Sequence, residues 1–274
     1  MQRFFALILF VFVAFAACKQ DPKNSATGAS AQTITSLTAS PLQLSGQWIA
    51  MDFCSRANQY GSVLSAMNNA HLPYCFAFEV SQERPDSVTC YNGFETFSLA
   101  ARYDGDTLLL LNARPGKNIY LIYDSQGDKS ITMFDATTEQ AQTDRFVKSR
   151  ANARDGYAAF LTALNHNVFG GTLTPLGKGA SAQVMFTPGG FIQGMSDYDR
   201  YELCTAGDCF VAGDRVDVVT FSKRKKEGSA KMFGFRYSAQ NDTLTFYNLL
   251  NKNPQEKAAY TLGSVAYRFL RKEQ

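Results

Sequence analysis

The chain has 274 residues, of which 45% are hydrophobic and 19% are charged. This composition is ordinary for a globular protein with room for one large domain or two small ones. Lys and Arg total 27 against 24 Asp and Glu, and this near balance argues against the basic face that nucleic-acid binding needs. Aromatic residues make up 13% of the chain, which favours sheets over helical bundles.

The first 17 residues have the pattern of an export signal. Arg3 provides a positive charge, residues 4–14 form an almost purely apolar run, and Ala16 and Ala17 place small side chains before Cys18. A membrane-spanning helix needs about 20 apolar residues, whereas a polar stretch begins here at Lys19. We therefore expect residues 1–17 to be a signal peptide that is removed by cleavage after Ala17.

The segment Phe15-Ala16-Ala17-Cys18 resembles a bacterial lipobox, which directs a diacylglyceryl group onto its cysteine. The resemblance implies a lipoprotein whose membrane partner is reached through the lipid on Cys18. Lipoproteins kept in the inner membrane typically carry Asp after this cysteine, and the chain has Lys19. The resemblance thus implies an outer-membrane lipoprotein that faces either the periplasm or the cell surface. The alternative is an ordinary secretory signal that ends at a cysteine by chance.

Residues 18–41 are rich in Ser, Thr, Ala, Gln and Asn and contain few large apolar side chains. Such a segment cannot bury enough surface to offset the entropy lost on ordering. The sequence therefore predicts a flexible tether, with a random-coil span of about 25–30 Å.

From residue 44 onward the sequence predicts a mainly β protein. Apolar and polar residues alternate with period two, and Gly, Asp, Asn or Pro regularly interrupts the pattern, which is typical of short antiparallel strands. The expected strands are 48–53, 74–80, 87–91, 95–103, 107–112, 118–124, 130–135, 172–176, 183–187, 199–204, 215–222, 231–237, 243–249, 258–262 and 265–270.

Two helices are expected between the strands. Residues 60–71 carry apolar side chains at helical spacing before Pro73, and residues 157–168 repeat that spacing behind Asp155, a favourable N-cap. Aligning the two helices indicates an internal repeat that would divide the folded part into two domains, residues 42–148 and 149–274.

A second match supports the repeat. Residues 102–108 and 236–244 both read Arg-Tyr, a turn, then Asp-Thr-Leu, which implies an insertion between the second helix and its hairpin. The alternative is that such sequences are common in any β-hairpin. The domain boundary stays open, because residues 144–148 resemble residues 267–271 and either close the first unit or open the second.

Each unit would hold about 100–130 residues of antiparallel sheet, which manages its edges by closing into an up-and-down barrel. The segment Gly46-Gln47-Trp48 resembles the Gly-x-Trp opening of lipocalin-like proteins, in which the Trp plugs the closed end of the barrel. The resemblance implies two tandem lipocalin-like β-barrels, each with one short helix. We expect Trp48 to be a core residue rather than a ligand contact.

The cysteines other than Cys18 are expected to lie in an oxidising compartment. They are Cys54, Cys75, Cys90, Cys204 and Cys209. Cys204 and Cys209 flank four turn-forming residues, so we expect them to form a disulfide across a hairpin. Cys75 and Cys90 also lie at the ends of neighbouring strands and are candidates for a second disulfide that leaves Cys54 free. Pairing of Cys54 with Cys75 is the competing choice.

The sequence contains none of the familiar hydrolase, zinc-protease or phosphate-loop motifs. Its only histidines, His71 and His166, lie at expected helix ends, where a zinc site would lack further ligands. We therefore expect no catalytic residues, no metal and no cofactor, although strands can assemble carboxylates that no motif reveals.

Two classes of function remain open. One is a small-molecule binding module whose barrels hold a small apolar or sugar-like ligand; the sequence singles out no ligand-binding residue. The other is a non-catalytic interaction or scaffold protein of the envelope, whose barrels are filled with side chains and whose protein partner the sequence does not identify.

Overall fold

A computed structural model of the chain describes residues 41–68, 72–177, 183–206, 216–224, 228–251 and 260–271. The described residues form one compact unit built on two antiparallel sheets of eight strands each. This confirms the predicted fold class, a mainly β protein with two up-and-down barrel-like sheets.

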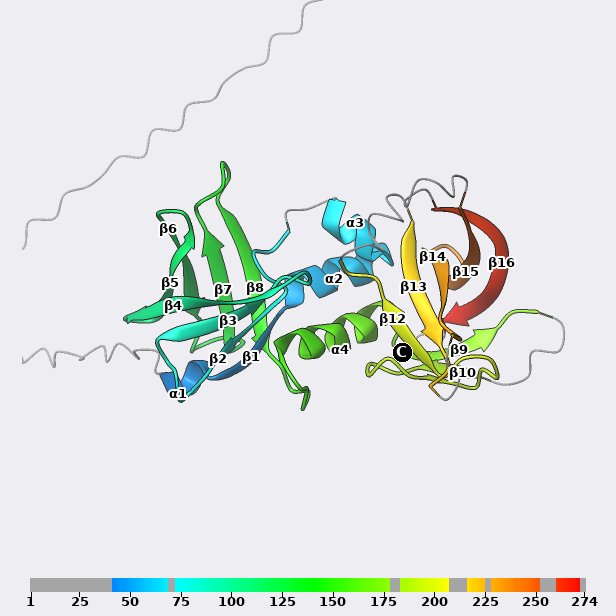
Figure 1. Cartoon of the computed structure of the whole chain (residues 1–274), viewed down its shortest axis with the longest axis horizontal. Coiled ribbons are helices and arrows are strands. Elements are labelled where there is room, and N and C mark those ends of the chain that lie inside the picture. The colour runs from blue at the N-terminus through cyan, green and yellow to red at the C-terminus, as the bar shows by residue number, and fades with distance from the viewer. Residues whose placement is uncertain are drawn as a thin grey trace, which may run out of the picture. The chain divides into compact units, whose positions relative to one another are not determined.

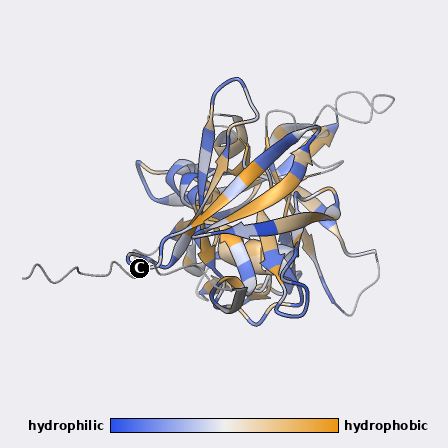
Figure 2. Cartoon of the chain, turned by 90° about the vertical axis from the view of Figure 1, so that its left-hand side faces the viewer, coloured by the Kyte–Doolittle hydropathy of each residue, from blue (hydrophilic) through white to orange (hydrophobic). Residues whose placement is uncertain are grey.

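The first sheet is a closed barrel (Figure 1). Each strand pairs with the next along the chain, and the last strand pairs back with the first, where Val147 lies opposite Ile49. Hydrophobic and hydrophilic residues are interspersed along these strands (Figure 2). In the strand at residues 117–123 buried and exposed residues alternate, so that one face lines the core. The strands are β1 (Gly46–Ala50), β2 (Ala77–Val80), β3 (Ser87–Tyr91), β4 (Thr96–Asp104), β5 (Thr107–Arg114), β6 (Lys117–Tyr123), β7 (Ser130–Asp135) and β8 (Gln142–Lys148).

The second sheet closes almost completely. Its first strand pairs with its last, and its two edges meet where Ile192 N–H donates to Asp199 O at 3.0 Å and Tyr201 N–H donates to Gly190 O at 2.9 Å. The strands are β9 (Gly171–Pro175), β10 (Val184–Phe186), β11 (Ile192–Gln193), β12 (Arg200–Leu203), β13 (Asp217–Ser222), β14 (Lys231–Ser238), β15 (Thr243–Asn251) and β16 (Tyr260–Arg271).

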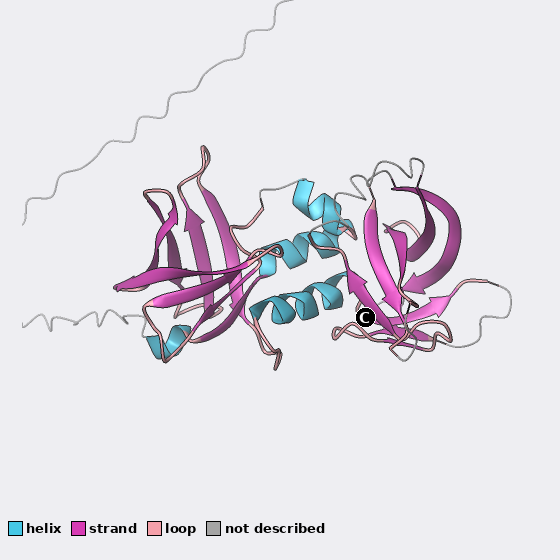
Figure 3. Ribbon diagram, in the orientation of Figure 1, coloured by secondary structure: helices cyan, strands magenta, loops and turns pink. Residues whose placement is uncertain are grey.

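Helices accompany the sheets (Figure 3). The described residues form four of them. They are α1 (Pro41–Leu44), which precedes β1, α2 (Met51–Tyr60) and α3 (Val63–Asn68), which connect β1 to β2, and α4 (Gly156–Val168), which leads into β9. The side chain of Asp155 accepts a hydrogen bond from Ala158 N–H at 2.8 Å, which confirms the predicted N-cap of α4.

The hydrophobic core is continuous from one sheet to the other. At the junction, the ring of Phe76 stacks on Phe160 of α4 at a centroid distance of 4.8 Å, and Phe53 of α2 lies 5.0 Å from Phe76. Beyond the end of α4, Phe169 enters the aromatic core of the second barrel and lies 4.8 Å from Phe235. The helices therefore lie within one continuous cluster of buried residues that extends through both barrels.

The structure corrects several expected boundaries. The strand expected at 48–53 ends at Ala50, and the chain turns directly into α2. The helix expected at 60–71 is divided, because Gly61 adopts a left-handed conformation (φ 57°) that ends α2. A Cβ at Gly61 would lie 2.5 Å from the ring of Tyr237, so only glycine fits there. The strands expected at 258–262 and 265–270 belong to one strand, β16.

The predicted repeat gains no support from the hairpins. Residues 102–108 lie in β4 and β5, the fourth and fifth strands of their sheet, whereas residues 236–244 lie in β14 and β15, the sixth and seventh. Because both sheets have eight strands, no insertion explains this offset. Residues 144–148 and 267–271 do occupy equivalent places, since each ends the last strand of its sheet and pairs with the first. Residues 144–148 therefore close the first barrel.

Candidate functional site

Large side chains fill the interiors of both barrels. Trp48, Phe78 and Phe146 are fully buried in the first, where the Trp48 ring stacks on Phe78 at 6.2 Å. The largest fully buried side chains of the second barrel are Phe169, Phe186, Phe221, Phe233, Phe235 and Phe246. Interiors filled in this way are packed cores. A binding site is therefore expected at the barrel ends or on the outer surfaces.

A cavity of about 700 Å³ lies beside the end of the first barrel that α1 closes. We call it the basic pocket, and it is lined by Gln43, Trp48, Ile49, Met51, Tyr123, Asp128, Lys129, Val147, Lys148, Ser149 and Arg150. Its volume is in the range of about 300–1,000 Å³ that is usual for small-molecule sites. It combines aromatic and aliphatic walls with three cationic side chains.

Trp48 fixes the floor of the basic pocket. Its Nε1–H donates to Leu44 O at 2.7 Å, and Leu44 is fully buried, so α1 closes this end of the barrel over the indole ring. The Lys148 ammonium lies 5.9 Å from the indole centroid, within reach of a cation–π interaction. Trp48 is only 1% exposed, which agrees with the expected core role, but it also lies at the wall of a cavity.

The charges around the basic pocket do not cancel. Lys129, Lys148 and Arg150 are exposed cations, and the only carboxylate in the lining is Asp128. That carboxylate is already paired, since Arg145 lies 3.1 Å from it and also contacts Asp52 at 3.5 Å. The basic pocket therefore carries an excess of positive charge that suits an anion.

The loop between β6 and β7 holds Lys129 in place. Asp124 Oδ1 accepts hydrogen bonds from Gln126 N–H at 3.1 Å and Gly127 N–H at 2.8 Å, and Asp124 N–H donates to Ser130 O at 2.9 Å. Lys129 itself has φ 51°, a conformation that non-glycine residues adopt rarely. The turn thus fixes the backbone that presents the Lys129 side chain to the basic pocket.

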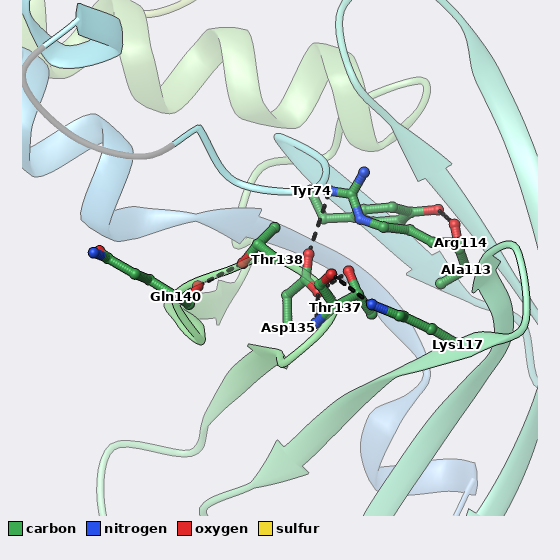
Figure 4. A network of polar contacts seen from close by, with 8 residues as sticks. All are labelled: Tyr74, Ala113, Arg114, Lys117, Asp135, Thr137, Thr138 and Gln140. Atoms are coloured by element: carbon green, nitrogen blue, oxygen red, sulfur yellow. Dashed lines mark hydrogen bonds and ion pairs between the residues drawn. The ribbon is translucent and has the colours of Figure 1, made fainter.

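A polar network at the opposite end of the first barrel has a structural role (Figure 4). Asp135 is 4% exposed and accepts hydrogen bonds from Thr137 N–H at 2.8 Å and Arg114 Nη2 at 3.4 Å. Tyr74 OH donates to Ala113 O at 2.7 Å, and the Arg114 guanidinium lies over the Tyr74 ring. Burial, together with the neighbouring thiols, raises the pKa of Tyr74 to about 12. Polar groups satisfied in this way rigidify a fold.

Several of the residues that the sequence analysis singled out lie outside the described part of the chain. Cys18 and Ala17 lie outside the described residues. Cys204 is disulfide-bonded; Cys209, its predicted partner, lies outside the described residues, so this pairing stays a prediction. His71 is also outside them, and His166 is an exposed residue in the last turn of α4.

The predicted disulfide between Cys75 and Cys90 is wrong for this structure, in which both are free, buried thiols. The strand register places Phe78, not Cys75, opposite Cys90, so the two cysteines are not the cross-strand pair that the prediction assumed. Cys90 nevertheless lies close enough to Cys75 to raise the pKa of its thiol, in addition to the larger effect of burial. Cys54 is also free and buried, and the competing bond between Cys54 and Cys75 is likewise not formed.

The three free thiols should resist alkylation while the protein is folded. Burial raises the pKa of Cys54 to about 12 and holds the pKa of Cys75 well above 9, and only the thiolate is nucleophilic. With iodoacetamide at about pH 8, mass spectrometry should show no label on Cys54, Cys75 or Cys90 in the folded protein, and a label on each after unfolding. Label on Cys54 alone after unfolding would instead mean that Cys75 and Cys90 had become disulfide-bonded.

Two further findings concern the described part of the chain. No group of three or more His, Cys, Asp or Glu side chains there is arranged to hold a metal ion. None of its helices combines the length and the apolar character needed to cross a membrane.

Comparisons with protein-family models, curated proteins and solved structures found no match for this chain.

Proposed function

We propose that the protein is a non-catalytic binding module of the cell envelope, anchored to the outer membrane through a lipid on Cys18. In this proposal the barrels are solid supports, and the ligand binds in the basic pocket of the first barrel. The ligand is an anionic amphiphile, with a phosphate or carboxylate head beside the cations and an apolar part against the walls. The observation that carries the proposal is the combination of Lys129, Lys148 and Arg150 with the Trp48 floor in one cavity.

The filled barrel interiors favour a ligand-binding site outside the barrels. A ligand held inside a barrel, as in a lipocalin-like protein, would need space that the buried Phe and Trp side chains occupy. The alternative of solid barrels with an external working surface fits the packing better. The basic pocket supplies such a surface with a defined chemistry.

The position of the basic pocket in the chain also supports an envelope ligand. Gln43 of α1 lines the pocket, and α1 begins directly after the segment expected to tether the protein. A tether with a span of about 25–30 Å would keep this end of the barrel close to a membrane surface, where anionic head groups attract Lys and Arg side chains.

Trp48 provides a direct test, because it is the only tryptophan of the chain. The native protein, extracted in dodecyl maltoside, is titrated with monomeric dihexanoyl phosphatidylglycerol, with dihexanoyl phosphatidylcholine and with inorganic phosphate. We expect a saturable change in Trp48 fluorescence with phosphatidylglycerol, little change with phosphatidylcholine, and weakening by salt because exposed charges are screened. A response to inorganic phosphate alone would identify a soluble anion as the ligand.

Charge removal completes the test. The triple variant Lys129→Gln, Lys148→Gln, Arg150→Gln should bind phosphatidylglycerol about a hundredfold more weakly, at about 1 kcal/mol for each lost charge. Arg102→Gln removes an exposed cation of β4 outside the pocket and should bind like the wild type. The proposal fails if the triple variant binds as tightly as the wild type, or if both lipids give the same response.

The anchor is tested separately. Replacing Cys18 with Ser should abolish labelling by radioactive palmitate and move the protein from the membrane fraction to the soluble fraction. A Cys18→Ser protein that still fractionates with the membrane and still carries acyl chains would exclude Cys18 as the site of lipidation.

A further inference from the structure

The second barrel has an incomplete seam between its first and last strands. β16 pairs with β15 along nearly its whole length, whereas it pairs with β9 only over Phe269–Arg271. One further backbone hydrogen bond, from Leu176 N–H to Arg268 O at 2.8 Å, lies at the end of this contact. Within the described part of the chain, residues 260–267 therefore have a strand partner on one side only. We call this stretch the open edge.

A bulge in β16 accounts for the divergence of the two strands. Tyr267 lies opposite Phe246. Two residues earlier, Val265 lies opposite Tyr247, the next residue of β15. Ala266 is thus an extra residue, with no opposite residue in β15. Such a residue bends a strand and increases its twist, and Figure 1 shows β16 strongly curved. β9 stays paired only with the last part of this curve.

A cavity of about 600 Å³ lies in the fork between β9 and the open edge. It is lined by residues 175–177, at the end of β9, and by residues 265–269 of β16. Successive side chains of a strand point to opposite faces. A cavity that contacts consecutive residues of β16 therefore runs along the edge of the strand rather than over one face. It shares no residue with the basic pocket.

The fork is mostly apolar. Tyr267 lies against the aromatic core, with its ring centroid 5.7 Å from that of Phe233, and Phe269 is buried. Val265 and Leu176 are 46% and 44% exposed. Apolar side chains beside the open edge therefore face solvent and offer contact surface to a partner.

The open edge lacks the residues that usually prevent pairing with another chain. Its sequence, Tyr-Thr-Leu-Gly-Ser-Val-Ala-Tyr, contains neither a charged residue nor a proline. Edge strands of soluble proteins commonly carry Lys or Pro, which hinder the approach of a further strand. A row of backbone N–H and C=O groups without a partner strand is what an extended peptide recognises when it adds to a sheet.

We propose that the open edge binds an extended peptide segment of another protein, which adds to β16 as a further strand. The backbone of this peptide would pair with residues 260–267, and its alternate side chains would contact Leu176 and Val265. An acidic residue at the end of the peptide beside Leu176 would pair with Arg268. This inference is independent of the function proposed for the basic pocket, which belongs to the first barrel.

Arg268 favours an acidic partner over a second copy of this chain. Its side chain is exposed, and among the described residues it forms no ion pair with a carboxylate. The open edge itself contains no carboxylate. Two copies paired edge to edge would therefore leave both Arg268 side chains without an acidic partner. Charge complementarity points instead to a different chain that carries Asp or Glu.

The test titrates the full chain in dodecyl maltoside with fluorescein-labelled heptapeptides of alternating Val and Thr. One peptide has Glu at its first position, one has Glu at its last position, and two have Lys in those places. We expect fluorescence anisotropy to show saturable binding of at least one Glu peptide. Its Lys counterpart should bind about fivefold more weakly, the effect of one exposed ion pair.

Backbone methylation separates strand addition from simple apolar contact. The tighter Glu peptide is N-methylated at every second residue, in each of the two possible registers. One register blocks the N–H groups that face β16 and should weaken binding about a hundredfold, the loss expected for about three hydrogen bonds. The other register blocks the solvent side and should bind like the parent peptide.

Hydrogen exchange and charge reversal locate the site. Bound peptide should slow amide exchange in residues 260–267 and leave residues 107–114 of the first barrel unchanged. Arg268→Glu should bind the Lys peptide more tightly than the Glu peptide. Arg236→Glu changes an exposed residue of β14 outside the fork and should keep the preference of the wild type. Both variants are checked for folding by circular dichroism.

Four outcomes overturn the proposal. They are no binding of either Glu peptide, equal binding of both N-methylated forms and the parent peptide, an unchanged preference for Glu in Arg268→Glu, and peptide-induced protection outside residues 260–267 alone. A dimer in sedimentation, with residues 260–267 protected before any peptide is added, would identify a second copy as the occupant and would also overturn it.

Discussion

Replacing Phe246 with Ala should lower the free energy of unfolding by about 3–5 kcal/mol, as is usual when a fully buried aromatic side chain is deleted. Phe246 lies in β15 and is 0% exposed. The rings around it, with centroids 5.0–6.3 Å away, belong to Phe169, Phe186, Phe221, Phe235 and Phe269. Because many domains are stable by only about 5–15 kcal/mol in total, this single change should bring the protein close to unfolding.

The same variant tests whether the two barrels unfold together. Phe246 lies in the second barrel, whereas Trp48, the only tryptophan, reports on the first. The buried residues of both barrels belong to one continuous hydrophobic cluster. We therefore expect denaturation followed by Trp48 fluorescence to shift to lower denaturant in Phe246→Ala, in parallel with the change followed by circular dichroism.

Phe94→Ala is the matched control. Phe94 is 74% exposed, and surface substitutions of this kind usually change stability by less than about 0.5 kcal/mol. If Phe246→Ala left the Trp48 transition unchanged while the circular dichroism transition shifted, the two barrels would be independent folding units. That outcome would contradict the energetic continuity of the core.

Local patterns were sufficient to predict much of the fold. The strands β3 and β7 lie at the predicted residues, 87–91 and 130–135, because period-two alternation between clear turn signals has one structural interpretation. After Ala50 the hydrophobic pattern is compatible with both a strand and a helix. Alternation continues to Phe53, but Phe53, Cys54 and Ala57 also have helical spacing, and burial of that face makes the segment α2. Tertiary packing, which the local pattern does not contain, decided between the two.

The basic pocket was beyond the reach of sequence patterns. Lys129 belongs to the turn between β6 and β7, whereas Lys148 and Arg150 lie at and just after the end of β8. They line one cavity because the β8–β1 pairing closes the barrel and brings these loops together. No motif spans such a group. The only indication of the pocket in the sequence is the presence of isolated positive charges at expected strand ends. Charged residues in ordinary solvated loops give the same pattern.

Helix α4 shows a second limit of pattern analysis. The spacing of residues 157–168 predicts the helix correctly. It does not show which side is buried: Phe160 and Leu164 are fully buried, whereas Leu161 and Thr162 are half-buried and line a cavity of about 410 Å³. A single helix that packs between two sheets carries more than one apolar face, and hydrophobic periodicity alone does not separate them.

Asp217 is expected to be the residue whose loss most weakens the contact between α3 and the second barrel. It lies at the start of β13, and its carboxylate accepts hydrogen bonds from Ser62 Oγ at 2.5 Å and Leu64 N–H at 2.9 Å. An acceptor at this place satisfies backbone donors at the start of α3, as an N-cap does. Asp217→Ala should therefore cost about 2 kcal/mol of unfolding free energy, the upper end of the usual range for a cap.

Two measurements separate this effect from simple loss of charge. In a double-mutant cycle with Ser62→Ala, a nonzero coupling energy between the two sites is expected, since the side chains are in direct contact. Asp197→Ala removes an exposed carboxylate that accepts a hydrogen bond from the adjacent Ser196. This change should leave stability nearly unchanged. Purely additive effects of Asp217→Ala and Ser62→Ala would contradict the role of this hydrogen bond.

The pH dependence of the free energy of unfolding should show whether ionisation of Asp217 stabilises or destabilises the fold. Burial raises the pKa of this carboxyl above its ordinary value of 3.8, and the hydrogen bonds from Ser62 and Leu64 offset only part of that rise. The folded state therefore holds the proton more tightly than the unfolded state, and the stability that this group contributes is present below the ordinary pKa and lost as the pH rises through the folded value. Relative to Asp217→Asn, which does not titrate, the wild type should lose stability as the pH rises from about 4 upward through that folded value. Thermal unfolding of both proteins across this window measures the difference, and a wild type that gained stability relative to Asp217→Asn would show that the hydrogen bonds outweigh burial.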